Sequence, residues 1–187
     1  MDIKFNPKKL EKLNNPDRLT MIPPTYIWEK LDIPECKTIV DIGAGTGLFS
    51  KAFLEQMENG RVYALDISDV MIQWMEENLS LYKGIIPLMM SETKTPLEDQ
   101  VADLVLMITL HHELEEPEKT LAEAHRLLKD GGKICIIDWK KEAMFSGPPL
   151  EIRCSTDDIS SDLKTVGFNR IQTDTSIEKV NMVWAEK

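Results

Sequence analysis

The sequence predicts a single α/β domain built on a mostly parallel β-sheet, and three observations carry this prediction. The chain has 187 residues, which corresponds to about one domain. From residue 38 onward, short apolar runs typical of buried strands alternate with segments whose apolar residues recur at helical spacing. A glycine-rich turn at residues 43–47 joins the first of these strands to the first helix. This alternation requires right-handed crossovers and places helices on both faces of the sheet.

The individual elements follow from local patterns along the chain. The expected strands lie at residues 38–42, 61–66, 85–90, 102–110, 133–138, 168–173 and 180–185, the last two forming a hairpin. The run at 102–110 is nearly continuous in apolar residues, as a central parallel strand should be. Helices are expected from residue 48, after the capping Ser68, from Pro117 to about residue 129, and at 156–166 before Gly167.

The segment before the first strand differs from the rest of the chain. Residues 1–30 contain four prolines and only a short helical pattern, so residues 1–35 are expected to form a helical arm and residues 36–187 the main domain. The loop at 139–150, after the fifth strand, is also irregular and proline-marked. Loops beyond strand ends often shape binding sites, so we expect the arm and this loop to form a lid.

Composition excludes several classes of protein. There are 32 acidic and 22 basic side chains, a net charge of −10, which argues against a nucleic acid as partner. The longest mostly apolar stretch, at 104–110, is far shorter than the ~20 residues of a membrane span, and the first ten residues contain no secretory signal. Three widely spaced cysteines without a CxxC pair favour reduced thiols in the cytoplasm and no thiolate metal site.

The glycine turn carries the first indication of chemistry. Gly43 permits a sharp turn and Gly45 permits a ligand to approach the backbone. The spacing is GxGxG, with Leu48 at the third position of the dinucleotide fingerprint and no basic residue in the turn, which disfavours a nicotinamide dehydrogenase. Asp66 ends the second strand, where its carboxylate can accept both hydroxyls of a ribose. The pattern predicts a nucleoside site without a diphosphate.

Four segments together resemble a known family. VDIGAGTG (40–47), ALDIS (64–68), ADLVLMITLHHEL (102–114) and LLKDGGKICIIDW (127–139) are similar to the motifs of class I S-adenosylmethionine-dependent methyltransferases. Within that class the chain resembles the small methyltransferases of ubiquinone and menaquinone biosynthesis. The resemblance covers residues 38–187. It implies a Rossmann-like, seven-stranded sheet in the order 3-2-1-4-5-7-6 with strand 7 antiparallel, and S-adenosylmethionine as cofactor.

The same resemblance assigns roles to individual residues. Asp41 would hold the methionine ammonium, and Gly43, Ala44 and Gly45 would line the methionine moiety. Asp66 would bind the ribose and Ile67 would contact the adenine. Ser91 and Glu92 would lie at the adenine edge, where the family often has Asp or Asn instead. The residues at the end of the fourth strand, Thr109 and Leu110, would lie beside the methionine.

Three residues directly follow the fourth strand and are the candidate general bases: His111, His112 and Glu113. His111 and His112 are adjacent, so at most one is expected to enter the pocket, where an imidazole could serve as general base. The alternative is structural: one histidine bonds a neighbouring loop and the other is exposed. The predicted function is methyl transfer to a small molecule by in-line displacement, without a metal. A protein or RNA methyltransferase and a non-catalytic S-adenosylmethionine-binding protein are the alternatives, and no motif specifies the oligomeric state.

Overall fold

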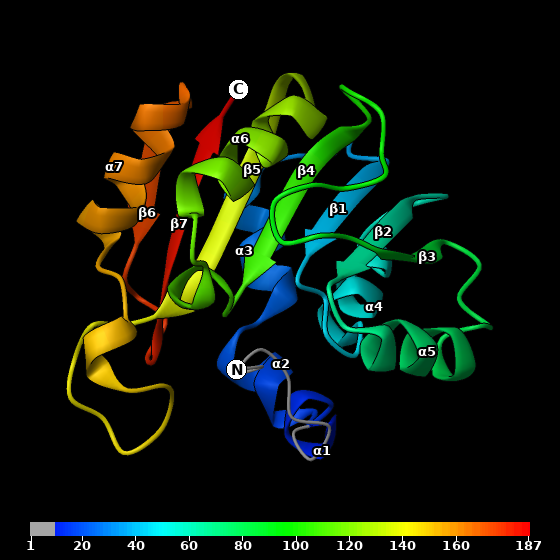
Figure 1. Ribbon diagram of the computed structural model, residues 1–187, viewed down its shortest axis with the longest axis horizontal. Helices are drawn as coiled ribbons and strands as arrows, with labels where there is room; N and C mark the ends of the chain where they lie inside the picture. The colour runs from blue at the N-terminus through cyan, green and yellow to red at the C-terminus, as the bar shows by residue number, and fades with distance from the viewer. Residues whose placement is uncertain (1–9) are drawn as a thin grey trace.

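The computed structural model describes residues 10–187 and shows one sheet with helices on both faces (Figure 1). The strands are β1 Thr38–Ile42, β2 Arg61–Asp66, β3 Ile85–Met89, β4 Ala102–Ile108, β5 Leu128–Trp139, β6 Asn169–Asp174 and β7 Val180–Glu186. The helices are α1 Leu10–Leu13, α2 Asp17–Met21, α3 Pro24–Leu31, α4 Leu48–Leu54, α5 Asp69–Asn78, α6 Pro117–Leu127 and α7 Thr156–Val166. Two short 3-10 helices, η2 His111–Glu113 and η3 Leu150–Ile152, follow β4 and β5.

The sheet has the strand order β3-β2-β1-β4-β5-β7-β6. Strands β1 to β5 pair in parallel, whereas β7 runs antiparallel to both β5 and β6. This topology confirms the order that the family resemblance implied. The strand order reverses between β1 and β4, which leaves a crevice beyond the carboxyl ends of these two strands.

The core forms two layers because successive side chains of a strand point to opposite faces of the sheet. In β4, Leu104 and Leu106 join the cluster beneath α3 and α4, whereas Val105 and Met107 join the cluster beneath α6 and α7. All four side chains are fully buried. The continuous apolar run of this strand is therefore explained by burial on both faces.

The described part of the predicted N-terminal arm is helical, and its last helix is part of the core. Ile27 and Leu31 of α3 are completely buried in the same cluster as the β4 side chains. The hydroxyl of Tyr26 donates to Asp174 Oδ2 at 2.6 Å, and Lys30 Nζ lies 3.3 Å from the same oxygen, so α3 is also tied to β6. Residues 1–9 of the predicted arm lie outside the described residues.

The fifth strand is longer than predicted. It begins at Leu128 rather than at residue 133, because Leu128 pairs with Ala102 before a shift in register brings Lys133 opposite Leu104. The glycines at 131 and 132 lie in this irregular stretch, where a glycine at φ 75° is tolerated inside the strand.

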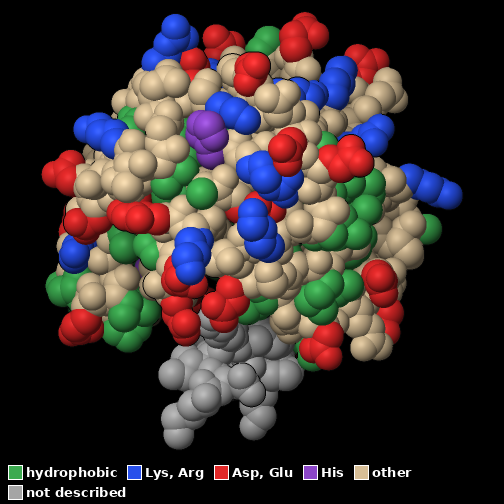
Figure 2. Space-filling view, turned by 45° about the horizontal axis from the view of Figure 1, so that its top comes forward, with side chains coloured by type: hydrophobic (Ala, Val, Ile, Leu, Met, Phe, Trp, Pro, Cys, Tyr) green, Lys and Arg blue, Asp and Glu red, His purple; other side chains and the backbone are tan. Residues whose placement is uncertain are grey.

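Charges of both signs are mixed over the described part of the face in Figure 2, where lysine and arginine side chains lie among acidic ones. That face therefore presents no continuous basic stripe of the kind that follows a phosphate backbone. Within residues 10–187, none of the helices has the length and apolar character needed to cross a membrane.

Candidate active site

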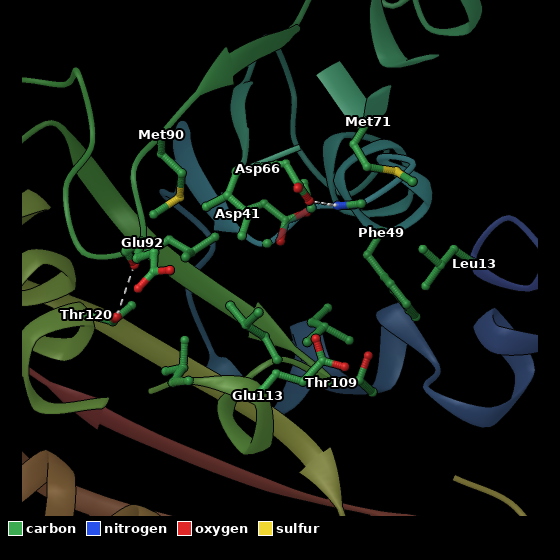
Figure 3. Close-up of a pocket in the computed structure, with 18 of the residues that line it drawn as sticks. Leu13, Asp41, Phe49, Asp66, Met71, Met90, Glu92, Thr109, Glu113 and Thr120 are labelled. Carbon is green, nitrogen blue, oxygen red and sulfur yellow. Dashed lines mark hydrogen bonds between the residues drawn. The ribbon is translucent and has the colours of Figure 1, made fainter. Parts of the chain in front are cut away.

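A cavity of about 200 Å³ lies at the carboxyl ends of the central strands, at the predicted crevice. Nine of the ten residues expected to contact the cofactor line it: Asp41, Gly43, Ala44, Gly45, Asp66, Ile67, Glu92, Thr109 and Leu110. The tenth, Ser91, does not line it and instead forms a tight turn in which its N–H donates to Lys94 O at 2.9 Å. In Figure 3, Met90 and Glu92 lie at one side of the cavity and Leu13 and Phe49 at the other.

The glycine turn forms one wall of the cavity, and its backbone conformation explains why glycine occupies positions 43 and 45. Gly43 and Gly45 have φ of 71° and 57°, a region in which side chains are strained. A Cβ on Gly43 would come within 2.8 Å of the Leu110 side chain, whereas a Cβ on Gly45 would meet only Leu13 Cδ1, at 3.8 Å. The space beside Gly45 is therefore open toward the cavity, as close approach of a ligand requires.

Asp66 holds the glycine turn and the start of α5 together. Its Oδ2 accepts from the N–H of Gly45 at 2.8 Å (Figure 3). Its Oδ1 accepts from the N–H of Ser68 at 3.0 Å. Burial raises the pKa of this carboxyl, against the lowering effect of these two N–H donors. Each carboxylate oxygen has a second lone pair, so Asp66 retains acceptor capacity for hydroxyl groups in the cavity.

Asp41, near the end of β1, is the most deeply buried acid of the site. Ser50 Oγ donates to its Oδ2 at 2.6 Å. Burial raises its pKa to about 7, with the Ser50 hydrogen bond and the charge of Arg18 acting in the opposite direction. A cationic ligand group at this carboxylate would compensate for the burial and favour its ionised form.

Thr109 follows β4 and occupies an unusual backbone conformation. Its φ is 52°, which is rare for a β-branched residue and is often found at functional sites. Its N–H donates to Ile137 O at 2.7 Å, and its hydroxyl accepts from Arg18 Nη2 at 3.0 Å. These two bonds fix the end of β4 against β5 on one side and against the arm on the other.

Apolar and sulfur-containing side chains also line the cavity. Ile67, Met71 and Met90 are among them. The hydroxyl of Thr120 on α6 donates to Glu92 O at 3.3 Å (Figure 3). The methionine side chains are flexible and polarisable, and they suit contact with an aromatic ring.

Both predicted catalytic histidines lie in η2, and neither lines the cavity. His111 is buried with its Nε2 3.1 Å from Asp162 Oδ2 of α7, and its Nδ1 has no hydrogen-bond partner among the described residues. His112 is buried against β5, where its Nδ1 lies 2.7 Å from Asp138 Oδ1. Direct catalysis by either histidine stays a prediction, and this geometry favours action through a neighbour.

That neighbour is Glu113, which does line the cavity. His112 Nε2 lies 3.7 Å from Glu113 Oε1. Burial alone would lower the pKa of His112, but the carboxylates of Asp138 and Glu113 outweigh it and raise the pKa to about 9. His112 is therefore an imidazolium at neutral pH, held between a buried carboxylate and one at the cavity.

The cavity is strongly acidic. Six carboxylic side chains line it: Asp41, Asp66, Glu92, Glu113, Glu115 and Glu116. Among the described residues, Arg18 of α2 is the single basic side chain in the lining. This distribution favours a ligand that has positively charged groups and that places an anionic group near Arg18.

Several lining residues were not predicted from the sequence. Leu13 and Arg18 belong to the arm, and Phe49 to α4. None of them lies in a motif, and Arg18 is 91 residues from its partner Thr109. The loop at 139–150, expected to take part in a lid, does not line this cavity; Arg153 donates to four of its carbonyls, and Phe145 is fully exposed.

Comparisons with known proteins agree with this geometry. The family model described as a methyltransferase domain matches residues 40–136. The crystal structure of an S-adenosylmethionine-dependent methyltransferase from Aquifex aeolicus matches with a TM-score of 0.91 and 32% identity, over 98% of this chain and 99% of that one. The chain belongs to the S-adenosylmethionine-dependent methyltransferases. Human N-acetylserotonin methyltransferase in complex with the cofactor shares the fold, with a TM-score of 0.78 and 17% identity over 96% of this chain and 56% of that one.

Curated relatives match a shorter stretch of sequence. The ubiquinone/menaquinone biosynthesis C-methyltransferase UbiE of Cupriavidus taiwanensis is 34% identical over 106 residues, 55% of this chain and 43% of that protein. UbiE of Bordetella avium is 31% identical over 115 residues, 60% of this chain and 45% of that protein. The chain thus spans less than half the length of these two curated relatives.

The cavity fits the cofactor of this family. S-adenosylmethionine carries a sulfonium and an ammonium, both positive, and a single carboxylate, which matches the acidic lining with its single arginine among the described residues. The open space beside Gly45 and the free acceptor capacity of Asp66 provide for a nucleoside that lies against the glycine turn. The polar groups of the cavity therefore match both the charged amino-acid end and the nucleoside end of the cofactor.

Proposed function

We propose that this chain transfers the methyl group of S-adenosylmethionine to a small-molecule acceptor by in-line displacement. The observation that carries the proposal is one cavity lined by the glycine turn, Asp41, Asp66 and the end of β4. The likeness to the Aquifex aeolicus methyltransferase over almost the whole of both chains supports it.

The proposed role of the protein is to bind and align. When bound, the cofactor supplies an activated methyl group on a positively charged sulfur. Asp66 holds the ribose, while Asp41 and the glycine turn hold the amino-acid end. Thr109 and Leu110 limit the position of the reacting centre from the β4 side. Displacement mostly requires that the acceptor be held in line at about 3 Å, so orientation supplies most of the rate gain.

A proton acceptor is required only when the acceptor molecule loses a proton. Glu113 is the group proposed for that task, because its carboxylate faces the cavity beside the end of β4 (Figure 3). His112 would then act as a positioning residue, with Asp138 holding the imidazolium in place. This arrangement gives the predicted histidine a role through Glu113 rather than by contact with substrate.

The arm supports a small acceptor rather than a macromolecule. Leu13 lies 3.8 Å from the position of a Gly45 Cβ, and Arg18 bonds the end of β4, so the arm covers one side of the cavity. A bulky chain would have to displace these contacts. The UbiE relatives are named for ubiquinone and menaquinone biosynthesis, so quinone precursors are the first small molecules to test.

Calorimetry with S-adenosylmethionine, S-adenosylhomocysteine and NAD tests the cofactor assignment. We expect the first two to bind and NAD not to bind. Transfer of a labelled methyl group is then followed into separated small-molecule, protein and RNA fractions of a cell extract. Label in the small-molecule fraction supports the proposal. Label in protein or RNA, or binding without any transfer, contradicts it.

A further inference from the structure

Arg18 is held at the cavity by neutral groups from three elements. Its Nη1 donates to Leu13 O at 2.9 Å, and its Nη2 donates to Thr109 Oγ1 at 3.0 Å. The guanidinium also lies 5.1 Å from the centre of the Phe49 ring, a cation–π distance. These contacts fix the side chain in one orientation and use only two of its five N–H donors.

The charge of Arg18 has no carboxylate partner at ion-pair distance among residues 10–187. Its polar partners there are a carbonyl and a hydroxyl. Burial lowers the pKa of the guanidinium, and the charge of Asp41 only partly compensates. Burying a cation in this way is unfavourable unless an anion joins it, so the site is arranged for an anionic group that arrives from the cavity.

The cofactor has one anionic group that fits this position. Its sulfonium and ammonium are positive and match the carboxylates of the lining, in particular Asp41. Its carboxylate would be repelled by those same acids everywhere except near Arg18. A guanidinium binds a carboxylate with paired N–H donors, and Arg18 retains donors for that purpose.

We propose that Arg18 binds the carboxylate of the methionyl part of S-adenosylmethionine, so that the N-terminal arm forms part of the cofactor site. This proposal rests on the proposed cofactor binding. The sheet supplies Asp41, Asp66 and the glycine turn, and the arm supplies the cation that they lack.

The arm and the cofactor then stabilise each other. Arg18 links α2 to Thr109 at the end of β4, and the cofactor carboxylate would add a second link between the arm and the sheet. Helices α1 and α2 bury no residue completely into the core, so their docking depends on contacts of this kind. By linkage, whatever the arm contributes to cofactor affinity, the cofactor contributes equally to arm docking.

Calorimetry with two matched ligands tests the proposal. Decarboxylated S-adenosylmethionine lacks only the carboxylate and retains the sulfonium, ammonium and nucleoside. A charged hydrogen-bonded pair of this type corresponds to about 10- to 100-fold in affinity. We expect the wild type to bind S-adenosylmethionine about 10- to 100-fold more tightly than the decarboxylated ligand. Arg18→Gln should bind both ligands with the same, weaker affinity.

The controls separate this role from packing and from failure of cofactor binding. Arg170→Gln removes an exposed arginine that pairs with Glu186 at 2.7 Å, and it should retain the wild-type discrimination. Arg18→Lys, which keeps the charge without the fork, should discriminate weakly. Equal discrimination by wild type and Arg18→Gln would overturn the proposal, because another group would then bind the carboxylate. No discrimination by the wild type would also overturn it, even if Arg18→Gln failed to fold. A wild type that binds neither ligand would instead refute the proposed function.

Discussion

The charge of His112 should make the stability of the fold depend on pH above neutrality. Its side chain is 2% exposed and lies 2.7 Å from Asp138 Oδ1. The folded-state pKa is about 9, against an ordinary value of about 6.5 in the unfolded chain. A pKa raised on folding stabilises the fold fully below the unfolded value, and this stabilisation is lost as the pH rises through the folded value.

The magnitude follows from the two pKa values. A difference of about 2.5 units corresponds to about 3 kcal/mol at low pH, of which about 2 kcal/mol should be lost between pH 7 and pH 9. Asp41 acts below this window: its pKa, raised to about 7, makes stability fall with rising pH only up to neutrality. Burial raises the pKa of the Cys36 thiol to about 12, so this group adds a further loss of folding stability as the pH approaches and passes 9.

Urea denaturation at pH 7, 8 and 9 measures the effect, and variants isolate it. His112→Asn keeps an N–H donor near the position of Nδ1 but does not titrate. We expect its free energy of unfolding to fall with pH by about 2 kcal/mol less than that of the wild type. His125→Asn serves as control, because burial lowers the pKa of His125 and it therefore acts below the window. If the His112→Asn and wild-type profiles run parallel, the imidazolium assignment is refuted.

Three further predictions concern the cofactor site. Asp66→Ala should weaken S-adenosylmethionine binding by ~1–3 kcal/mol, because it removes the proposed ribose acceptor and releases the Gly45 N–H; calorimetry that shows unchanged affinity would remove Asp66 from the site. Gly45→Ala should lower cofactor affinity at least about tenfold, whereas Gly131→Ala, at an open position of β5 with φ 75°, should leave it unchanged although both replacements strain the backbone; equal effects would assign Gly45 a purely structural role. Hydrogen exchange should slow in residues 10–21 when the cofactor is added, while α3 is already protected without it; an arm that is fully protected when empty would argue against a lid.

The strands could be predicted because burial on both faces leaves a clear signature. The apolar run of β4 and the glycine turn after β1 are local patterns, and their physical causes are also local. Local patterns alone do not determine the strand order, because pairing of β1 with β4 across about 60 residues leaves no mark at either position. The family resemblance supplied that order instead. The start of β5 was misplaced because two adjacent glycines are also typical of a turn.

The candidate site was predictable where a backbone feature demanded a particular residue. The glycines at positive φ and an acid at the end of β2 meet that condition, and Gly43, Gly45 and Asp66 all line the cavity. Arg18 does not meet it, because a single arginine in a polar arm is normally a solvated surface residue. Its role depends on the three contacts that folding brings together. The pairing of His112 with Asp138 is also a tertiary event, although both residues lie in recognised motifs.

The buried residues of the arm show where a lid could move. Ile22, Ile27 and Leu31 are completely buried, so opening the arm beyond Ile22 would expose core side chains at a cost of several kcal/mol. Helices α1 and α2 contain no buried residue, and the contacts of Arg18 hold them at the cavity. Among the described residues, we therefore expect lid motion only in residues 10–21. Removing the whole arm would remove buried core side chains as well as the Arg18 guanidinium. The packing role of the arm and its proposed carboxylate-binding role can therefore be separated only by substitutions at single positions.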